Sequence, residues 1–211
     1  QNLSEVYGGD GVWMWVYDPW TWKERSAIAF DSSNPTGGDW DLGSPNEAYG
    51  GPGKGSGGST NTEALGNIMI LAENTSDHNG DGLVDTPDDD VYGGIFYYYF
   101  DEPVCLDSLD LIDVQDVAYF YFYDTRGYYM GGGAVGHSGD NGVLNVTSTA
   151  FGVGYLIIDL WGSGGFDNIT VCPDTHTSHK NCDENGHHHR MIDDAEMSAE
   201  LLDTEELVQV R

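Results

Sequence analysis

The acidic loop at residues 77–88 carries the strongest chemical signal in the sequence. Its short oxygen-bearing side chains follow the pattern D-x-[DN]-x-[DN]-G-x5-[acid], which is typical of a calcium-binding loop. Such side chains point inward on a tight turn, Gly82 permits that turn, and the last carboxylate closes the coordination shell. The expected ligands are Asp77, Asn79, Asp81, Asp85 and Asp88. The flanking residues look strand-like, so the pattern predicts Ca²⁺ bound between two strands; the alternative is an ordinary solvated acidic turn.

A second set of oxygen donors lies in the long loop at residues 30–58. This stretch consists mostly of Gly, Pro, Ser, Asn and Asp, so we expect no regular structure in it. A loop of this length in a compact domain usually has a function. Its candidate ligands are Asp31, Asn34, Asp39 and Asp41. The loop is therefore either a second calcium site or a polar crossover between strands.

Aromatic side chains are concentrated near the start of the chain. Trp13, Trp15 and Tyr17 alternate, so they share one face of a strand, and Trp20 and Trp22 follow directly. One interpretation is that these side chains cover the core from a sheet edge. The other is that the four tryptophans form a platform for stacking sugars or a contact with another subunit.

The charge balance excludes two classes of partner. Lys and Arg number 7 against 36 Asp and Glu, which gives a formal net charge of −29. Such a surface repels nucleic acid and anionic membranes. No stretch approaches the roughly 20 apolar residues that a membrane-spanning helix needs, so we expect no membrane insertion. The chain also repels itself, and divalent cations would relieve that repulsion.

Several features favour a secreted or cell-surface protein. The sequence begins at Gln1 without Met, as expected of a processed N-terminus. N-glycosylation acceptor patterns occur at Asn2, Asn74, Asn145 and Asn168. These predict a calcium-binding extracellular glycoprotein.

The three cysteines allow at most one disulfide within the chain. Cys172 and Cys182 are the expected pair, because they would close a short loop at the end of the domain. Cys105 lies in an apolar strand-like run, and we expect it to pack as a small hydrophobic side chain.

Strand patterns dominate from residue 12 to residue 172. In AYFYFYD, Tyr119, Tyr121 and Tyr123 share one face and Phe120 and Phe122 share the other, which we expect to face the core. Residues 95–100 are aromatic on both faces and predict a central strand buried on both sides. Residues 143–148, 153–161 and 166–172 predict three closing strands, and 125–142 predict a turn region. Short strands with regular turn signals indicate an all-β, jelly-roll-like sandwich.

The segments GGPGKGSGG, LGNIMILAEN, GGIFYYYFDEPVCLDSLDLIDVQD and GSGGFDNITV, together with the two acidic loops, resemble one protein family. It comprises the calcium-dependent jelly-roll modules of secreted and surface-anchored microbial proteins. The resemblance covers about residues 28–172. It implies one calcium ion between the early acidic loop and the last strand, held by Asp31, Asn34, Asp39 and Asp167. Biochemical activity varies across such modules, so the resemblance implies fold and calcium more than function.

The two ends of the chain differ from the sandwich. Residues 1–11 predict a polar N-terminal arm. Residues 173–211 form an acidic, His-containing tail with helical propensity at 194–207, which we expect to dock on its own domain or, preferably, on a neighbouring subunit. Possible transition-metal ligands in this tail are His176, His179, Cys182, His187, His188 and His189. Their spacing fits no closed zinc site, so a polar tail is the simpler interpretation.

The sequence supports two functional hypotheses, and neither is enzymatic. Glu73 and Glu102 are the only carboxylates we would consider for glycoside hydrolysis, and His137 lacks a nucleophile partner. The first hypothesis is a calcium-stabilised structural subunit that assembles into filaments or a surface layer. Its terminal arms, at residues 3–7 or 206–210, would add as strands to a neighbour's sheet edge. The alternative is a carbohydrate-binding module that uses the tryptophan platform.

Overall fold

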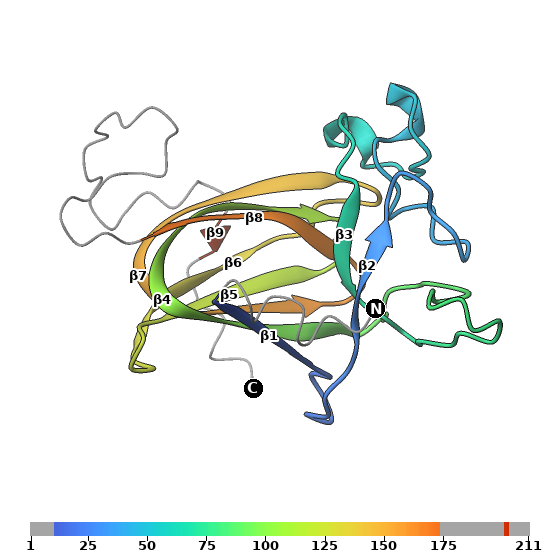
Figure 1. Ribbon diagram of the computed structural model, residues 1–211. Helices are drawn as coiled ribbons and strands as arrows, with labels where there is room; N and C mark the ends of the chain where they lie inside the picture. The colour runs from blue at the N-terminus through green and yellow to red at the C-terminus, as the bar shows by residue number, and fades with distance from the viewer. Residues whose placement is uncertain (1–10, 174–200, 203–211) are drawn as a thin grey trace.

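The computed structural model describes residues 11–173 and 201–202, and these form an all-β structure (Figure 1). No helix of seven or more residues occurs in this part of the chain. Two short 3-10 helices, η2 (Glu47–Tyr49) and η3 (Gly58–Thr60), lie in the long loop. The strands are β1 (Val12–Tyr17), β2 (Ala27–Asp31), β3 (Asn67–Leu71), β4 (Gly93–Ile112), β5 (Val117–Tyr123), β6 (Tyr129–Val135), β7 (Val143–Trp161), β8 (Gly165–Pro173) and β9 (Leu201–Leu202).

The strands form one antiparallel sheet that folds over into two layers. The first layer has the order β1, β4, β7, β5, β6, through residues 95–100 of β4 and 155–161 of β7. The second layer has the order β2, β3, β8, β4, β7, through the other halves of β4 and β7. The sandwich-like, all-β prediction is confirmed, and the jelly-roll topology stays a prediction.

Strands β4 and β7 pass from one layer to the other, and Figure 1 shows them curving together at one end of the molecule. Their pairing shifts register three times between Tyr99 and Ser108 of β4, so bulges accommodate the bend. The prediction that 143–148 and 153–161 are separate strands is wrong. They are the two halves of β7, which continues through the bend because Gly152 adopts a left-handed φ of 74° there.

Successive side chains of β4 and β5 point alternately into the core and toward an aromatic outer face. Phe120 and Phe122 are buried and their tyrosine neighbours are half-buried, which confirms the predicted faces of β5. Residues 95–100 are central in the first layer, as predicted, but only one face is fully buried. Phe96 lies in the core, whereas Tyr97 and Tyr99 remain half-buried on the outer face.

One prediction about an irregular segment is wrong, and a second segment forms a strand. The turn region predicted at 125–142 contains β6, which pairs with β5 because its glycines allow close backbone approach; a Cβ on Gly132 would lie 2.2 Å from the Phe120 carbonyl oxygen. In the tail, where the sequence has helical propensity at 194–207, residues 201–202 form β9, which pairs with Ala134 and Val135 of β6. These two residues lie on the chain's own domain, and docking of the tail on a neighbouring subunit stays a prediction. Residues 1–10 and the rest of the tail lie outside the described residues.

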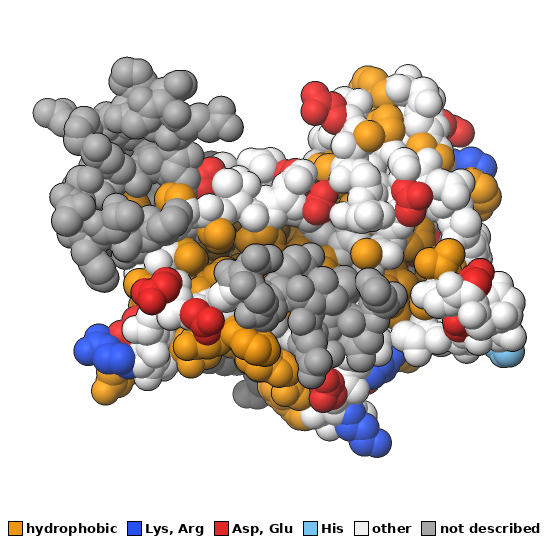
Figure 2. All heavy atoms as spheres, viewed as in Figure 1, with side chains coloured by type: hydrophobic (Ala, Val, Ile, Leu, Met, Phe, Trp, Pro, Cys, Tyr) orange, Lys and Arg blue, Asp and Glu red, His pale blue; other side chains and the backbone are white. Residues whose placement is uncertain are grey.

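The long loop covers part of the second layer. Leu42 is fully buried in a second hydrophobic cluster with Ile28, Phe30, Ile68 and Ile70 of β2 and β3. This packing holds the Asp39–Asp41 region against the end of the sandwich opposite the bend. On the face drawn in Figure 2, Asp and Glu side chains lie mostly on the loops at the ends, and hydrophobic side chains lie between them.

We expect the two faces of β5 to differ sharply in their contribution to stability. Phe120→Ala removes a side chain that is 3% exposed and should lower the free energy of unfolding by about 3–5 kcal/mol. Tyr119→Ala, on the outer face, should cost less than half as much. Urea unfolding of both variants measures this; equal losses would contradict the assignment of faces.

Candidate ligand groove and acidic centre

An open groove of about 490 Å³ lies on the outer face of the first layer. Its floor is formed by side chains of β4, β5 and β7, including Tyr97, Tyr121, Ile157 and Trp161. The aromatic rings of this face contact one another in rows. Tyr119 stacks on Tyr121 with centroids 6.4 Å apart and lies 5.2 Å from the Trp161 ring. The strands therefore present a rigid, largely aromatic surface.

Trp20 and Trp22 form one rim of the groove. They are 72% and 62% exposed, which is unusual for tryptophan. Both lie in a tight turn after β1, where Asp18 Oδ1 accepts hydrogen bonds from the backbone N–H groups of Trp20 and Thr21 at 2.9 and 2.7 Å. These backbone bonds lower the pKa of Asp18. The turn holds both indoles out of the core.

Arg25 ties this turn to the neighbouring rim. Its guanidinium donates to Asp18 Oδ2 at 3.1 Å and to Asp90 Oδ2 at 2.8 Å. Asp90 also accepts from the backbone N–H of Tyr92 at 3.0 Å, and Tyr92 lines the groove. One buried carboxylate thus fixes two rim segments that are far apart in the sequence.

The polar groups of the groove are acids and phenols. Asp116 and Asp159 line it, and Asp159 Oδ2 accepts a hydrogen bond from Trp161 Nε1 at 3.1 Å. Burial, with the Asp159 charge next, raises the pKa of Tyr121 to about 12 and also raises the pKa of Tyr97. Both phenols therefore stay neutral and able to donate hydrogen bonds throughout the physiological range.

Only two of the four tryptophans of the predicted platform line the groove. Trp20 and Trp22 line the groove, while Trp13 and Trp15 lie on the outer face of β1, each 37% exposed, and do not line it. Trp13 Nε1 donates to Asp101 Oδ1 at 3.3 Å. Sequence reasoning missed the floor residues Tyr97 and Trp161, although the alternation of β5 indicated a tyrosine face.

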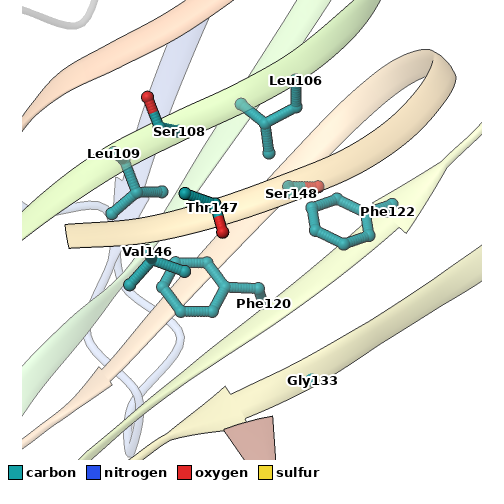
Figure 3. A pocket seen from close by; sticks show the side chains of 9 residues that line it. All are labelled: Leu106, Ser108, Leu109, Phe120, Phe122, Gly133, Val146, Thr147 and Ser148. Carbon is teal, nitrogen blue, oxygen red and sulfur yellow. The ribbon is translucent and has the colours of Figure 1, made fainter. Parts of the chain in front are cut away.

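The other two cavities are less suited to a polar ligand. A cavity of about 10 Å³ between β4, β5 and β7 is lined by Leu106, Phe120, Val146 and their neighbours (Figure 3). It has room for about one water molecule. A third opening of about 460 Å³ lies between β1, β3 and β8 and is lined largely by apolar side chains such as Phe100 and Phe166.

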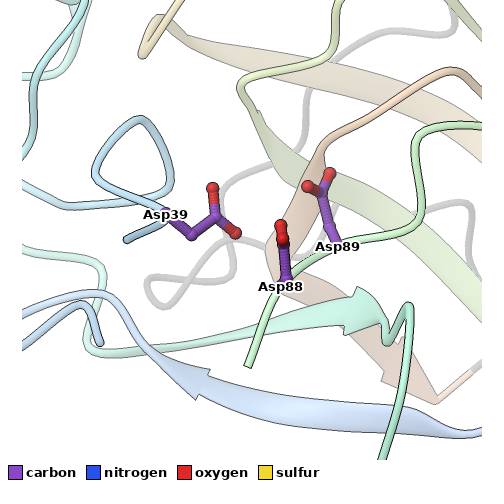
Figure 4. A group of neighbouring side chains, drawn as sticks. All are labelled: Asp39, Asp88 and Asp89. Carbon is purple, nitrogen blue, oxygen red and sulfur yellow. The ribbon is translucent and has the colours of Figure 1, made fainter. Parts of the chain in front are cut away.

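An acidic centre lies where the long loop meets the start of β4. Asp39, Asp88 and Asp89 each bring a carboxylate oxygen within 4.8 Å of the others, and Figure 4 shows Asp39 pointing toward the other two. Burial raises the pKa of Asp39 to about 9 and that of Asp89 to about 6. Asp89 Oδ2 also accepts a hydrogen bond from the Gly164 N–H. These three residues could hold a metal ion.

A second group of three carboxylates adjoins the first. Asp41, Asp113 and Asp140 also lie within 4.8 Å of one another. Burial raises the pKa of Asp113 to about 7, and the charges of Asp41, Asp89 and Asp140 act in the same direction. The Asp41 carboxylate also acts to raise the pKa of Asp39, so the two groups are close enough to interact electrostatically. Sequence reasoning had not selected Asp89, Asp113 or Asp140.

Three of the predicted calcium ligands enter these groups: Asp39 and Asp41 from the long loop and Asp88 from the loop at 77–88. Asp31 accepts from Ser33, and Asp167 lies opposite Asp110 in the β4–β8 pairing. Asn34 donates its backbone N–H to the Asp31 carbonyl oxygen. The structure therefore does not bring Asp31, Asn34 and Asp167 into either described group.

The loop at 77–88 is organised by hydrogen bonds to its own backbone. Asp77 accepts from the N–H groups of Gly80 and Gly82 at 2.6 and 2.9 Å, and Asp81 accepts from Leu83. Asn79 Oδ1 accepts from the Asp81 N–H. Asp85 pairs with His78 at 2.8 Å. Calcium in this loop stays a prediction.

The predicted modification sites are partly described. Asn145 and Asn168 are exposed, and both donate to Asp110, at 2.7 and 2.8 Å. Asn74 is half-buried and accepts from the Ser76 N–H. Cys105 is buried as a thiol, and Cys172 is disulfide-bonded. Asn2, Cys182 and the tail histidines lie outside the described residues.

The residues considered for catalysis do not meet in a cavity. Glu73, Glu102 and His137 are exposed, and none of them lines any of the three cavities. The absence of enzymatic activity stays an expectation.

Comparisons with known proteins do not place the chain in a family. No family model matches the sequence, and no curated protein or solved structure is significantly similar to it. The resemblance to calcium-dependent jelly-roll modules therefore stays a prediction. Within the described residues, no helix has the length and apolar character needed to cross a membrane.

Asp89 of the first carboxylate group and Asp113 of the second should make the metal-free protein less stable as pH rises from 4 to 6. The pKa values of Asp89 and Asp113, about 6 and 7, exceed the unfolded value of about 3.9. The folded state therefore binds more protons in this window, so the free energy of unfolding falls as pH rises. Asp18, Asp85 and Asp124 have lowered pKa values and act below this window.

Urea unfolding in chelator at pH 4, 5 and 6 measures this slope. Asp113→Asn keeps an oxygen that can accept from the Asn141 N–H and should flatten the profile. A wild-type stability that increases over this range, or an Asp113→Asn profile identical to wild type, would show that these carboxyls do not behave as described.

Proposed function

We propose that this chain is a glycan-binding module and that the aromatic groove is its binding site. The observation that supports it best is the combination of a groove of about 490 Å³, an aromatic floor and two highly exposed tryptophans at the rim. Ligand sites commonly have this size, with apolar walls and a few polar groups. Pyranose rings carry an apolar C–H face that packs on aromatic rings, and their hydroxyls need hydrogen-bond partners.

The charges of the groove favour a neutral glycan. Asp116 and Asp159 line it, and the chain carries a net charge of −29. Both would repel uronic acids, sulfated sugars and nucleic acids. Carboxylates accept hydrogen bonds from sugar hydroxyls, and the neutral phenols of Tyr97 and Tyr121 can donate them. A short neutral oligosaccharide satisfies both sets of groups.

The rim is organised before any ligand binds. The Asp18–Arg25–Asp90 ion pairs hold the tryptophan turn against the Tyr92 segment, with Arg25 and Asp90 side chains 27% and 10% exposed. A rim that is already ordered loses little conformational freedom on binding. This supports a ligand site more than an incidental aromatic surface.

Calcium is the ion that we propose for the Asp39–Asp88–Asp89 group. Carboxylate oxygens are ligands for hard cations, and loops that gather several of them suit Ca²⁺. Extracellular calcium modules bind with dissociation constants of about 10⁻⁴–10⁻³ M, so a secreted location belongs to the same proposal.

A calcium-stabilised structural subunit is the second candidate function. The observation that favours it is the pairing of β9 with the outer edge of β6, at Ala134 and Val135. This edge accepts a strand from a distant part of the chain, and the same backbone groups can accept a strand from another copy. Filaments or surface layers would then form by strand addition.

We expect Trp22→Ala and Trp20→Ala to weaken glycan binding by roughly thirtyfold each, because losing a central aromatic contact costs about 2 kcal/mol. A glycan array identifies the ligand, and isothermal titration calorimetry measures its affinity. Trp40→Ala is the matched control: Trp40 is 44% exposed, lies beside Lys54 and does not line the groove.

Two results would contradict the glycan proposal. One is an array without any bound neutral glycan at millimolar calcium. The other is a bound glycan whose affinity is unchanged in both rim variants, which would move the site away from the groove.

Electron microscopy tests the structural alternative. In millimolar calcium, purified protein should form filaments or sheets that dissolve on chelation. Met130→Lys, at an exposed position of β6, should reduce assembly if this edge accepts the neighbour's strand, because a charge on an edge strand opposes strand addition; Trp22→Ala should not. Dispersed particles in both conditions would rule out this candidate and leave the glycan proposal intact.

A further inference from the structure

Three carboxylates from widely separated parts of the chain meet beside the ends of β4 and β7. Asp41 comes from the long loop, Asp113 directly follows β4, and Asp140 precedes β7. Asp113 is buried, Asp41 is half-buried and Asp140 is exposed. The group therefore extends from the interior of the loop layer to solvent, which gives an ion a route in.

Asp113 has an unused ligand atom. Its side chain is 1% exposed, and its Oδ1 accepts from the Asn141 N–H at 2.6 Å. Its Oδ2 is buried and has no hydrogen-bond partner within the described residues. An ionised, buried carboxylate oxygen without a donor, beside two more carboxylates, is strongly unfavourable, and either protonation or a bound cation relieves that cost. None of the four ion pairs among the described residues involves this group.

A network of buried asparagines fixes the segments that carry the three acids. Asn141 Nδ2 donates to the carbonyl oxygens of Asp41 and Gly43, at 2.6 and 2.7 Å. Asn46 Nδ2 donates to Asn141 Oδ1 at 2.7 Å, and Asn61 Nδ2 donates to the Asn141 carbonyl oxygen at 3.1 Å. The amide side chains of this network attach the long loop to the segment before β7. The Asp140 carboxylate adds to this attachment, because its Oδ2 accepts hydrogen bonds from the Ser56 N–H and Oγ at 2.9 and 3.1 Å.

The backbone at this point is held in a costly conformation. Asp113 and Asn141 both have left-handed φ values, 55° and 59°. Non-glycine residues in this region are uncommon and are retained where the surrounding structure requires them, often at functional sites. With these conformations the Asp113 carboxylate lies near the other two acids and accepts the Asn141 N–H.

We propose that Asp41, Asp113 and Asp140 bind a divalent cation of the calcium type. Each of the three carboxylates offers one oxygen within 4.8 Å of the other two, and water reaching the exposed Asp140 side would supply the further ligands of a shell of six to eight. An all-oxygen set selects hard cations over zinc or copper. The site is distinct from the Asp39–Asp88–Asp89 group, and it does not depend on the glycan proposal.

Calcium titration of the full chain, stripped of metal with chelator, tests the site. Isothermal titration calorimetry and calcium-dependent melting are measured for wild type, Asp113→Asn, Asp140→Asn and Asp88→Asn. The two variants of the proposed site should lose one binding event, or weaken it at least tenfold, and show a smaller calcium-dependent rise in Tm. Asp88→Asn should retain that event. Glu102→Gln, an exposed carboxylate outside both groups, is the charge-matched control.

Three outcomes would overturn the proposal. Wild type without calcium binding would remove the site, and unchanged binding in both Asp113→Asn and Asp140→Asn would move the ion elsewhere. If Asp113→Asn loses the calcium-binding event and Asp140→Asn keeps it, the three-carboxylate site is ruled out. If Asp113→Asn does not fold, as judged by circular dichroism, the exposed Asp140→Asn variant decides the question alone.

Discussion

The pairing of β4 with β7 along both layers is the constraint on which the rest of the structure depends. Gly93 pairs with Trp161 at one end of this ladder and Ile112 pairs with Val143 at the other. Because both strands fold back at the bend, all four of their ends reach the same side of the sandwich. The acidic residues 88, 89, 113 and 140 immediately flank those ends, and Gly164 follows β7. The acidic centre is therefore a direct consequence of how the two long strands bend.

The outer face of the first layer is the other product of this arrangement. Strands β4 and β5 each place aromatic residues on both faces, so the layer that buries Phe96 and Phe120 also presents Tyr97 and Tyr121 outward. A solvent-facing aromatic surface of this extent does nothing for the core and is typical of a binding surface. The two ion pairs of Arg25 also lie at this surface, and they order the groove rim without covering the groove floor.

The sequence predicted local features much better than tertiary ones. The faces of β5 followed from the alternation of Phe and Tyr. The identity of the acidic centre did not follow, because Asp39 and Asp88 had been assigned to separate sites, each read from local spacing. Asp113 ends an apolar run and carries no motif, so only the bend in β4 and the left-handed φ at that residue reveal its position. The continuity of β7 was equally hidden, since Gly152 reads as a break in one dimension.

The groove and the acidic centre share a short piece of backbone. Asp88 and Asp89 belong to the centre, Asp90 holds Arg25 and the Tyr92 N–H, and Val91 and Tyr92 line the groove. The chain must enter β4 directly afterwards at Gly93, where φ is 71° and a Cβ would lie 2.0 Å from the Leu160 carbonyl oxygen. Only glycine fits there, so the five residues before it have little freedom to adjust. Repulsion among Asp39, Asp88 and Asp89 acts on one end of this segment, and the groove rim occupies the other. If the proposed cation binds these carboxylates, it reduces a repulsion that acts on the same short segment as the groove rim, so the two proposed sites would be coupled without direct contact.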